Sequence, residues 1–96
     1  MIKVKHTKDF TLISGHANYS DYGQDIVCAS VSSIITTTIN AMVRLVPDTF
    51  KYTDKSGEVR IEILVDNETT KTLVTNMIEL LKDLEQQYPK NIKFEN

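Results

Sequence analysis

Apolar residues recur at helical spacing from about Gln24 to Leu45, and this long periodic stretch limits the folds open to so short a chain. The repeating positions are Val27, Val31, Ile34 or Ile35, Thr38 and Met42. The run of three threonines at 36–38 has poor helix propensity, so burial on several sides must hold the helix. Pro47 ends it. The pattern therefore predicts a central helix.

A second helix is predicted between Asn67 and Pro89, with a cleaner apolar stripe than the first. The stripe consists of Leu73, Val74, Met77, Ile78, Leu81, Leu84 and Tyr88. Asn67 or Thr69 is suited to the N-cap, because its side-chain oxygen can accept a hydrogen bond from the first turn. Pro89 stops the helix.

Five short segments carry strand patterns. They are residues 2–6 and 10–14, two strands on either side of a turn at Gly57, and a last strand through Ile92 and Phe94. The period-two apolar positions of the first two are Ile2 with Val4 and Phe10 with Leu12. The order ββαββαβ predicts an α+β fold in one domain, residues 1–96, with two helices packed on a small, mainly antiparallel or mixed sheet.

Composition narrows the function classes. The net charge is −2, and the 11 basic residues are interspersed with 13 acidic ones, which argues against direct nucleic-acid binding. No apolar run is expected to approach the roughly 20 residues that span a bilayer, and the start of the chain lacks the apolar centre of a signal peptide. A single cysteine permits no internal disulfide. We therefore expect a cytoplasmic protein with no membrane partner.

Cys28 is the candidate nucleophile. A lone cysteine is usually a small, inert, buried residue. If Asp25 is the N-cap, however, Cys28 lies in the first turn of the helix, where unpaired N–H groups and the helix dipole favour the reactive thiolate. The same N–H groups could stabilise the oxyanion that forms when a thiolate attacks a carbonyl.

His16 is the candidate base. It follows the strand 10–14, and a twelve-residue excursion can bring its side chain to Cys28, which would pair a nucleophile with a base. A solvated loop residue is the alternative interpretation. His6 alternates with apolar residues on a strand, and we assign it no chemistry. One histidine and one cysteine are too few for a closed zinc site, so no metal or other cofactor is expected.

Gly15 and Gly23 bracket a loop between the strand and the helix. Gly15 suits an unusual backbone angle or the close approach of a substrate chain. Tyr19 and Tyr22 either form a lid that touches a peptide or pack onto the sheet edge. The loop with Tyr19, Tyr22 and Gly23 is therefore the candidate substrate loop.

Two further residues could support the pair. Asp25 could orient His16, although a role as N-cap would occupy its carboxylate. Ser32 lies one turn after Cys28 on the same helix face and could line the same pocket, or it could bond to a backbone carbonyl as many serines in helices do.

The pattern GHA-x(6)-G-x-DIVCA-x-VS, from Gly15 to Ser32, resembles the signature of the ribosomal-processing cysteine protease family, Prp. The resemblance implies a homodimeric endopeptidase that removes the N-terminal extension of a large-subunit ribosomal protein, number twenty-seven, after an apolar segment. It also implies His16 and Cys28 as the catalytic pair. Asp25 and Ser32 become supporting residues and Gly15 a loop hinge.

Two alternatives stay open. A non-catalytic factor could bind the ribosomal protein's N-terminal arm as an added strand, with Cys28 as a small residue in the groove. A thiol redox sensor could use Cys28 alone, although the chain has no second cysteine to resolve it.

Overall fold

A computed structural model describes residues 1–15 and 22–95 of the chain, with only the backbone of 22–25. The elements are the strands β1 (Ile2–His6) and β2 (Phe10–Ser14), helix α1 (Tyr22–Leu45), strands β3 (Phe50–Lys55) and β4 (Glu58–Ile63), helix α2 (Glu68–Gln87) and strand β5 (Ile92–Glu95). A 3₁₀ turn at Pro47–Thr49 follows α1. The predicted order ββαββαβ is confirmed.

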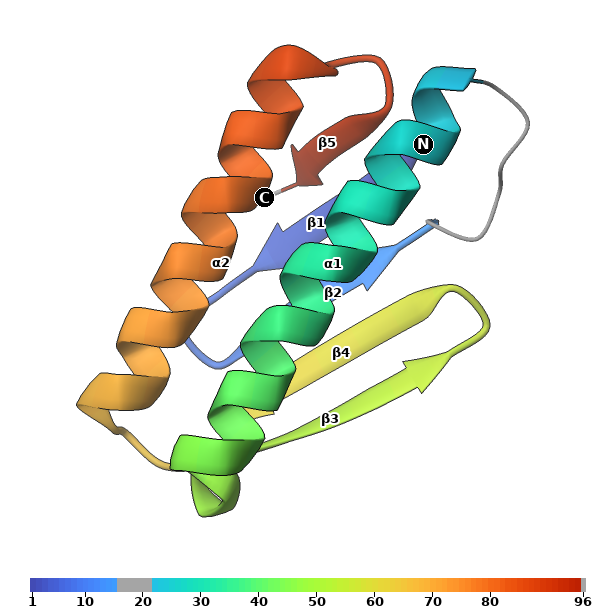
Figure 1. Ribbon diagram of the computed structural model, residues 1–96. Coiled ribbons are helices and arrows are strands. Elements are labelled where there is room, and N and C mark those ends of the chain that lie inside the picture. The colour runs from blue at the N-terminus through green and yellow to red at the C-terminus, as the bar shows by residue number, and fades with distance from the viewer. Residues whose placement is uncertain (16–21, 96) are drawn as a thin grey trace.

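The five strands form one sheet in the order β3-β4-β2-β1-β5, and both helices lie on the same face of it (Figure 1). The neighbours β1–β2, β2–β4 and β3–β4 are antiparallel, whereas β1 and β5 are parallel. Strand β4 is also parallel to β5, and α2 provides the crossover connection between these two strands. The sheet is therefore mixed, as predicted.

The core lies between the helices and the sheet. Helix α1 buries Val27, Cys28, Val31, Ile35, Thr38, Ile39 and Met42, and α2 buries Thr70, Val74, Met77, Ile78, Leu81 and Leu84. These sets confirm the predicted stripe of α1 and select Ile35 over the half-buried Ile34. They also confirm the predicted stripe of α2 except for Leu73 and Tyr88, which are only partly buried. The sheet contributes Ile2, Val4, Ile13, Val59, Ile61 and Ile92. The chain's apolar side chains thus converge on one layer boundary.

Helix α1 is more apolar than the sequence suggested. Its 20-residue segment Ile26–Leu45 contains an 18-residue window with a mean hydropathy of 1.7, and by length and composition alone it could cross a membrane. The expectation that no apolar run approaches this length is therefore wrong. Serine, threonine and alanine lie between the larger apolar residues, so no continuous apolar run is visible in the sequence. These small residues nevertheless lower the mean hydropathy of the segment only a little. Here the apolar stripe of α1 packs on the sheet, which accounts for the composition.

Local signals set the ends of several elements. Asn67 caps α2, since its Oδ1 accepts a hydrogen bond of 3.1 Å from the amide of Thr70. In the β3–β4 turn, Ser56 and Gly57 both have positive φ, 53° and 76°. Two such residues in a two-residue connection match the twist of the flanking strands. The predicted turn at Gly57 and the Asn67 cap are both confirmed.

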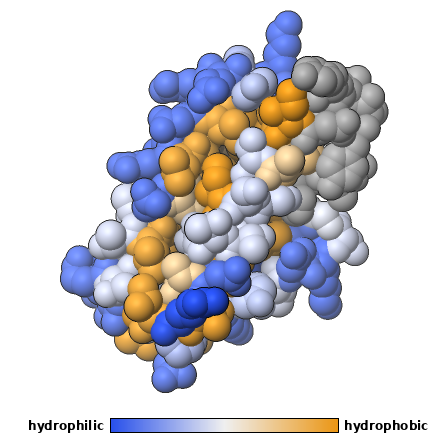
Figure 2. Space-filling model, viewed as in Figure 1, coloured by the Kyte–Doolittle hydropathy of each residue, from blue (hydrophilic) through white to orange (hydrophobic). Residues whose placement is uncertain are grey.

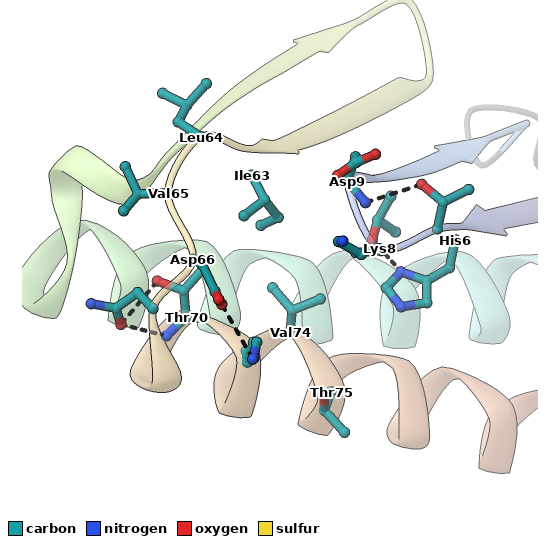
Figure 3. Close-up of a pocket in the computed structure, with 14 residues that line it drawn as sticks. His6, Lys8, Asp9, Ile63, Leu64, Val65, Asp66, Thr70, Val74 and Thr75 are labelled. Atoms are coloured by element: carbon teal, nitrogen blue, oxygen red, sulfur yellow. Dashed lines mark hydrogen bonds and ion pairs between the residues drawn. The ribbon is translucent and has the colours of Figure 1, made fainter.

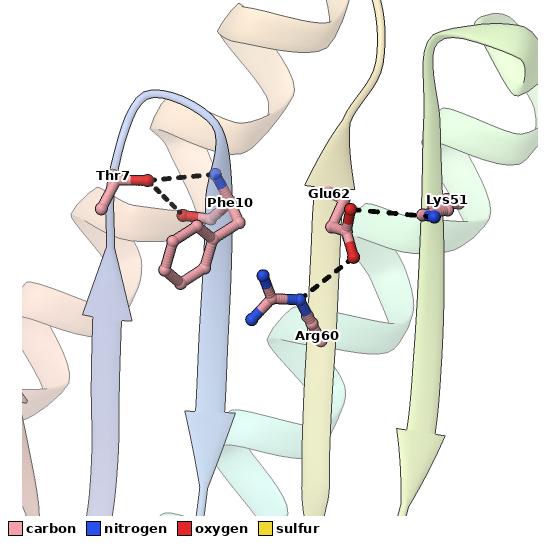
Figure 4. A network of polar contacts seen from close by, with 5 residues as sticks. All are labelled: Thr7, Phe10, Lys51, Arg60 and Glu62. Carbon is pink, nitrogen blue, oxygen red and sulfur yellow. Dashed lines mark hydrogen bonds and ion pairs between the residues drawn. The ribbon is translucent and has the colours of Figure 1, made fainter.

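The period-two apolar positions of β2, Phe10 and Leu12, share one face, but that face is not the buried one. Thr11 and Ile13 are buried, whereas Phe10 and Leu12 are half-buried on the face that the helices leave open. The short β1–β2 connection fixes a register in which Ile13 lies opposite Val4. On the open face the Arg60 guanidinium lies 4.4 Å from the centre of the Phe10 ring, and Arg60 also bonds to Glu62 (Figure 4). Because β2 carries apolar residues on both faces, alternation alone could not choose between them.

Two alanine variants test this assignment. Ile13→Ala leaves a cavity in the core and should lower the free energy of unfolding by about 2–4 kcal/mol. Leu12→Ala removes the same number of side-chain carbons, but from the half-buried position on the face that the helices leave open. Its effect should therefore be less than half as large. Urea unfolding of both variants measures the difference. A larger loss for Leu12→Ala would contradict the register.

Candidate active site

Cys28 lies in the second turn of α1, on the face that packs against the sheet. Its exposed fraction is 1%, and it belongs to the same core cluster as Val27 and Val31. The alternative that a lone cysteine is simply a buried residue is therefore correct as far as the position of Cys28 is concerned. Burial alone does not decide whether the thiol reacts.

The helix begins earlier than the sequence suggested. It starts at Tyr22, so Asp25 is inside the first turn and is not the N-cap, and Cys28 is one turn further along than predicted. The backbone N–H groups that lack a partner within the helix are those of residues 22–25. The dipole effect is largely confined to the first turn, so it contributes less at Cys28 than expected. The extra turn carries no apolar periodicity, which is why the pattern missed it.

This start also changes the predicted substrate loop. Tyr22 and Gly23 are the first residues of α1 rather than loop residues. His16 and Tyr19 lie outside the described residues, as do the side chains of Tyr22 and Asp25. Their predicted roles stay predictions.

Ser32 follows Cys28 by one turn, but the two side chains differ in environment. Ser32 is exposed and Cys28 is buried. Residues four apart on a helix are offset by about 40° around its axis, so the edge of the buried stripe passes between them. The predicted role of Ser32 in the same pocket as the thiol stays a prediction.

Gly15 ends β2 at a crowded point where three segments meet. Its φ is +83°, a backbone angle that residues with a side chain rarely adopt. A Cβ at this position would collide with the carbonyl oxygen of Met1. Its amide donates a hydrogen bond of 3.1 Å to the carbonyl oxygen of Gly57 in the β3–β4 turn. Of the two explanations offered for this glycine, the unusual backbone angle is confirmed. Sequence reasoning did not identify Met1 or Gly57 here, because both contacts are made by backbone atoms of distant residues.

A hollow of about 580 Å³ in the described part of the chain contains none of the predicted site residues. It lies between the β1–β2 turn, the β4–α2 connection and the first turns of α2 (Figure 3). His6 lines it and bonds through Nδ1 to the Thr11 hydroxyl at 2.8 Å. Partial burial, with a smaller effect of the Lys82 charge, lowers the pKa of His6, so its ring is neutral at pH 7.

This hollow is not a cysteine protease site. His6 lies at the end of β1 opposite to Ile2, and the Ile2 end is where Gly15 meets Met1. No cysteine lines the hollow, and among residues 1–15 and 22–95 no three histidine, cysteine or acidic side chains group as metal ligands would. The candidate site is therefore the Gly15 end of the sheet and the N-terminal half of α1.

Solved structures share this fold. The Prp protease of Staphylococcus aureus in complex with a substrate peptide superposes with a TM-score of 0.84 at 24% identity, over 98% of this chain and 95% of that one. The same protein with a covalently linked product peptide gives a TM-score of 0.79 at 25% identity, with the same coverage. The topology described above is therefore that of a known peptidase.

The sequence matches agree with the fold. The ribosomal processing cysteine protease Prp of Staphylococcus aureus is 31% identical over 86 residues, which cover 85% of this chain and 80% of that protein. These matches, together with the fold, define the chain as a cysteine protease. The model of the cysteine protease Prp family matches residues 1–93, and the chain belongs to that family.

The packing around Gly15 leads to a prediction. Gly15→Ala should lower the free energy of unfolding by about 2–4 kcal/mol, because the variant suffers both a strained backbone angle and the collision with Met1. Gly57→Ala, at a similar φ of 76°, measures the cost of such an angle in a turn, which should be about 1 kcal/mol. Thermal unfolding compares the two, and equal losses would show that the Met1 contact costs nothing.

Proposed function

We propose that this protein is an endopeptidase that removes the N-terminal extension of a large-subunit ribosomal protein, number twenty-seven, with Cys28 as nucleophile and His16 as base. One observation carries the assignment of the nucleophile. The chain belongs to a cysteine protease family and has a single cysteine, so Cys28 is its only thiol. The covalently linked product peptide in the Staphylococcus aureus protease supports attack by a protein side chain.

A similar argument from the few available residues supports His16 as the base. The chain has two histidines, and His6 is at the far end of β1 with its Nδ1 bonded to Thr11. His16 directly follows Gly15, which is fixed at the near end of the sheet. Since Cys28 is beyond the first turn of α1, the helix terminus gives the thiolate less support than the sequence suggested. Activation of the thiol then depends more on the histidine.

The chemistry follows from these roles. His16 takes the proton of Cys28, and the thiolate attacks the carbonyl carbon of the scissile bond. The N–H groups of residues 22–25 are the helix donors without intrahelical acceptors, and they are the candidates to bind the oxyanion. Protonated His16 then gives its proton to the leaving amine. Water hydrolyses the remaining thioester and frees the enzyme.

Burial of the thiol adds a requirement. The carbonyl carbon must come within about 3–3.5 Å of the sulfur for attack, yet only 1% of Cys28 is exposed. Peptide binding must therefore be accompanied by a movement that uncovers the sulfur.

The substrate class rests on the relatives. Curated relatives from Staphylococcus aureus are named ribosomal processing cysteine proteases. We propose a ribosomal protein as the substrate of this chain too, bound through apolar and aromatic side chains of an extended segment. The net charge of −2 offers no strong electrostatic attraction for a basic or an acidic partner. Because the proposed substrate is a ribosomal protein, we also propose that the enzyme acts in the cytoplasm.

Substitution of Cys28 tests the mechanism. Cys28→Ala should reduce kcat/KM for the ribosomal protein's extension by about 10³-fold or more, because no other thiol can replace it. Ser33→Ala changes an exposed residue of the same helix and serves as the control. Mass spectrometry of the incubated ribosomal protein detects the shortened N-terminus. A protein that binds the extension but never shortens it would be the non-catalytic factor, and cleavage by Cys28→Ala would remove the thiol mechanism.

We also propose that the protein acts as a homodimer. Three large apolar side chains of the helices, Val43, Leu45 and Leu80, are exposed by 47%, 65% and 43%. Apolar surface is in view on the helix side of the molecule (Figure 2). A symmetric partner that covers such surface gains the hydrophobic stabilisation of its burial.

Sedimentation equilibrium measures the assembly. At micromolar concentration the mass should be about twice the chain mass of 10.9 kDa. A fully active species that sediments at the mass of one chain would contradict the dimer.

A further inference from the structure

The outer edge of β3 presents main-chain hydrogen-bonding groups that no described residue uses. The amide of Ile63 donates to Asp9 and that of Gly15 donates to Gly57, so the odd-numbered residues of β4 face β2. Its even-numbered residues therefore pair with the odd-numbered residues of β3. The N–H and C=O groups of Phe50, Tyr52 and Asp54 then point outward. Strand β3 is the last strand on its side of the sheet (Figures 1 and 4).

The opposite edge of the sheet is closed. Strand β5 turns the amides of Ile92 and Phe94 outward, and both have acceptors within the chain. The Ile92 amide donates to the carbonyl of Tyr88 at 3.2 Å, and the Phe94 amide donates to the Glu85 carboxylate at 2.8 Å. Covering an edge in this way prevents another strand from pairing there. Of the two edges, only β3 keeps outward donors without described acceptors.

The open edge of β3 ends close to Gly15, the residue before the proposed base. Strand β3 runs from Phe50 to Lys55 and ends at the turn whose Gly57 carbonyl holds the amide of Gly15. Gly15 directly precedes His16. Six residues of strand extend over about 20 Å, so a peptide laid along β3 reaches the end of the sheet where the proposed base begins.

A second copy of the chain is a poor occupant of this edge. Antiparallel pairing of two β3 strands must place outward-facing residues opposite each other. A register centred on Thr53 puts Lys51 of each copy opposite Lys55 of the other, and like charges directly opposite are destabilising. A register centred on Tyr52 puts the Asp54 carboxylate opposite Phe50. The proposed dimer is therefore expected to use another surface.

We propose that the edge of β3 is the strand on which the substrate's extended segment adds before cleavage. This inference rests on the proposed function and names the surface that binds the peptide. Main-chain hydrogen bonds to Tyr52 and Asp54 hold an extended peptide regardless of its sequence, and side-chain contacts select it. The peptide thereby becomes the sixth strand of the sheet for part of its length.

Tyr52 supplies the side-chain selection. It lies on the helix-covered face opposite the buried Ile61, yet it is 48% exposed because it is on the last strand. Its ring stacks on that of Phe50, with centroids 6.3 Å apart and an interplanar angle of 20°. An apolar or aromatic side chain of an added strand, next to Tyr52 on this face, would cover the exposed part of the ring. The edge therefore favours an apolar segment in the substrate.

Hydrogen exchange locates the peptide without altering β3. The full-length Cys28→Ala protein is saturated with a synthetic peptide of the ribosomal protein's N-terminal extension, and amide exchange is followed by NMR. The amides of Tyr52 and Asp54 should exchange at least tenfold more slowly, because each gains an acceptor. Those of Thr53 and Phe94 already have acceptors and should not change. Bound peptide with unchanged exchange at Tyr52 and Asp54 would overturn the proposal.

A pair of variants tests the hydrogen bond in catalysis. Asp54→Pro and Asp54→Ala both lose the carboxylate, but only proline removes the outward N–H, and an edge strand tolerates proline where the N–H faces out. The proline variant should have a KM about 5- to 30-fold above that of the alanine variant, with kcat little changed. Thermal unfolding confirms that both fold. Equal KM values would show that the peptide does not add at Asp54.

The two proposals fail in different ways. If the wild-type protein leaves the extension peptide intact, the proposed function is wrong. If it cleaves the peptide while the Asp54→Pro and Asp54→Ala variants have equal KM values, the proposed function is upheld. Only the assignment of β3 as the peptide-binding edge is then wrong.

Discussion

The packing of the α1 apolar stripe on the sheet is the contact on which the rest of the structure depends. It buries Val27, Val31 and Met42 completely and makes a helix from a threonine-rich segment of low intrinsic propensity. Cys28 shares this stripe, so the same contact that stabilises the fold also positions the chain's single thiol, the proposed nucleophile. Because this thiol is buried, the proposed attack on a substrate requires that it be uncovered.

Backbone atoms fix Gly15, which directly precedes the proposed base in the sequence. Gly15 touches the first residue of the chain and the turn of a distant hairpin, and neither contact involves a side chain. Residue 15 therefore tolerates no Cβ. Side-chain packing thus fixes the thiol, and main-chain contacts fix Gly15.

The two edges of the sheet show a division of tasks. Strand β5 gives its outward amides to Tyr88 and Glu85, whereas β3 keeps its outward groups for an added strand. Lys51 and Lys55, on the open face, disfavour pairing between the β3 strands of two copies because their like charges would lie opposite each other. An enzyme that binds an extended peptide needs one accessible edge, and the closed edge limits where the peptide can pair.

The sequence by itself determined the order of elements, both helical stripes, the Asn67 cap and the identity of the only thiol, because these depend on local periodicity, capping and composition. It could not determine the buried face of β2, which has apolar residues on both sides and takes its face from the register with β1. It also misplaced the start of α1, since the added turn buries no apolar stripe. The environments of Ser32 and Gly15, and the contrast between the two sheet edges, were decided by tertiary structure alone, because they depend on backbone and packing contacts between residues far apart in the chain.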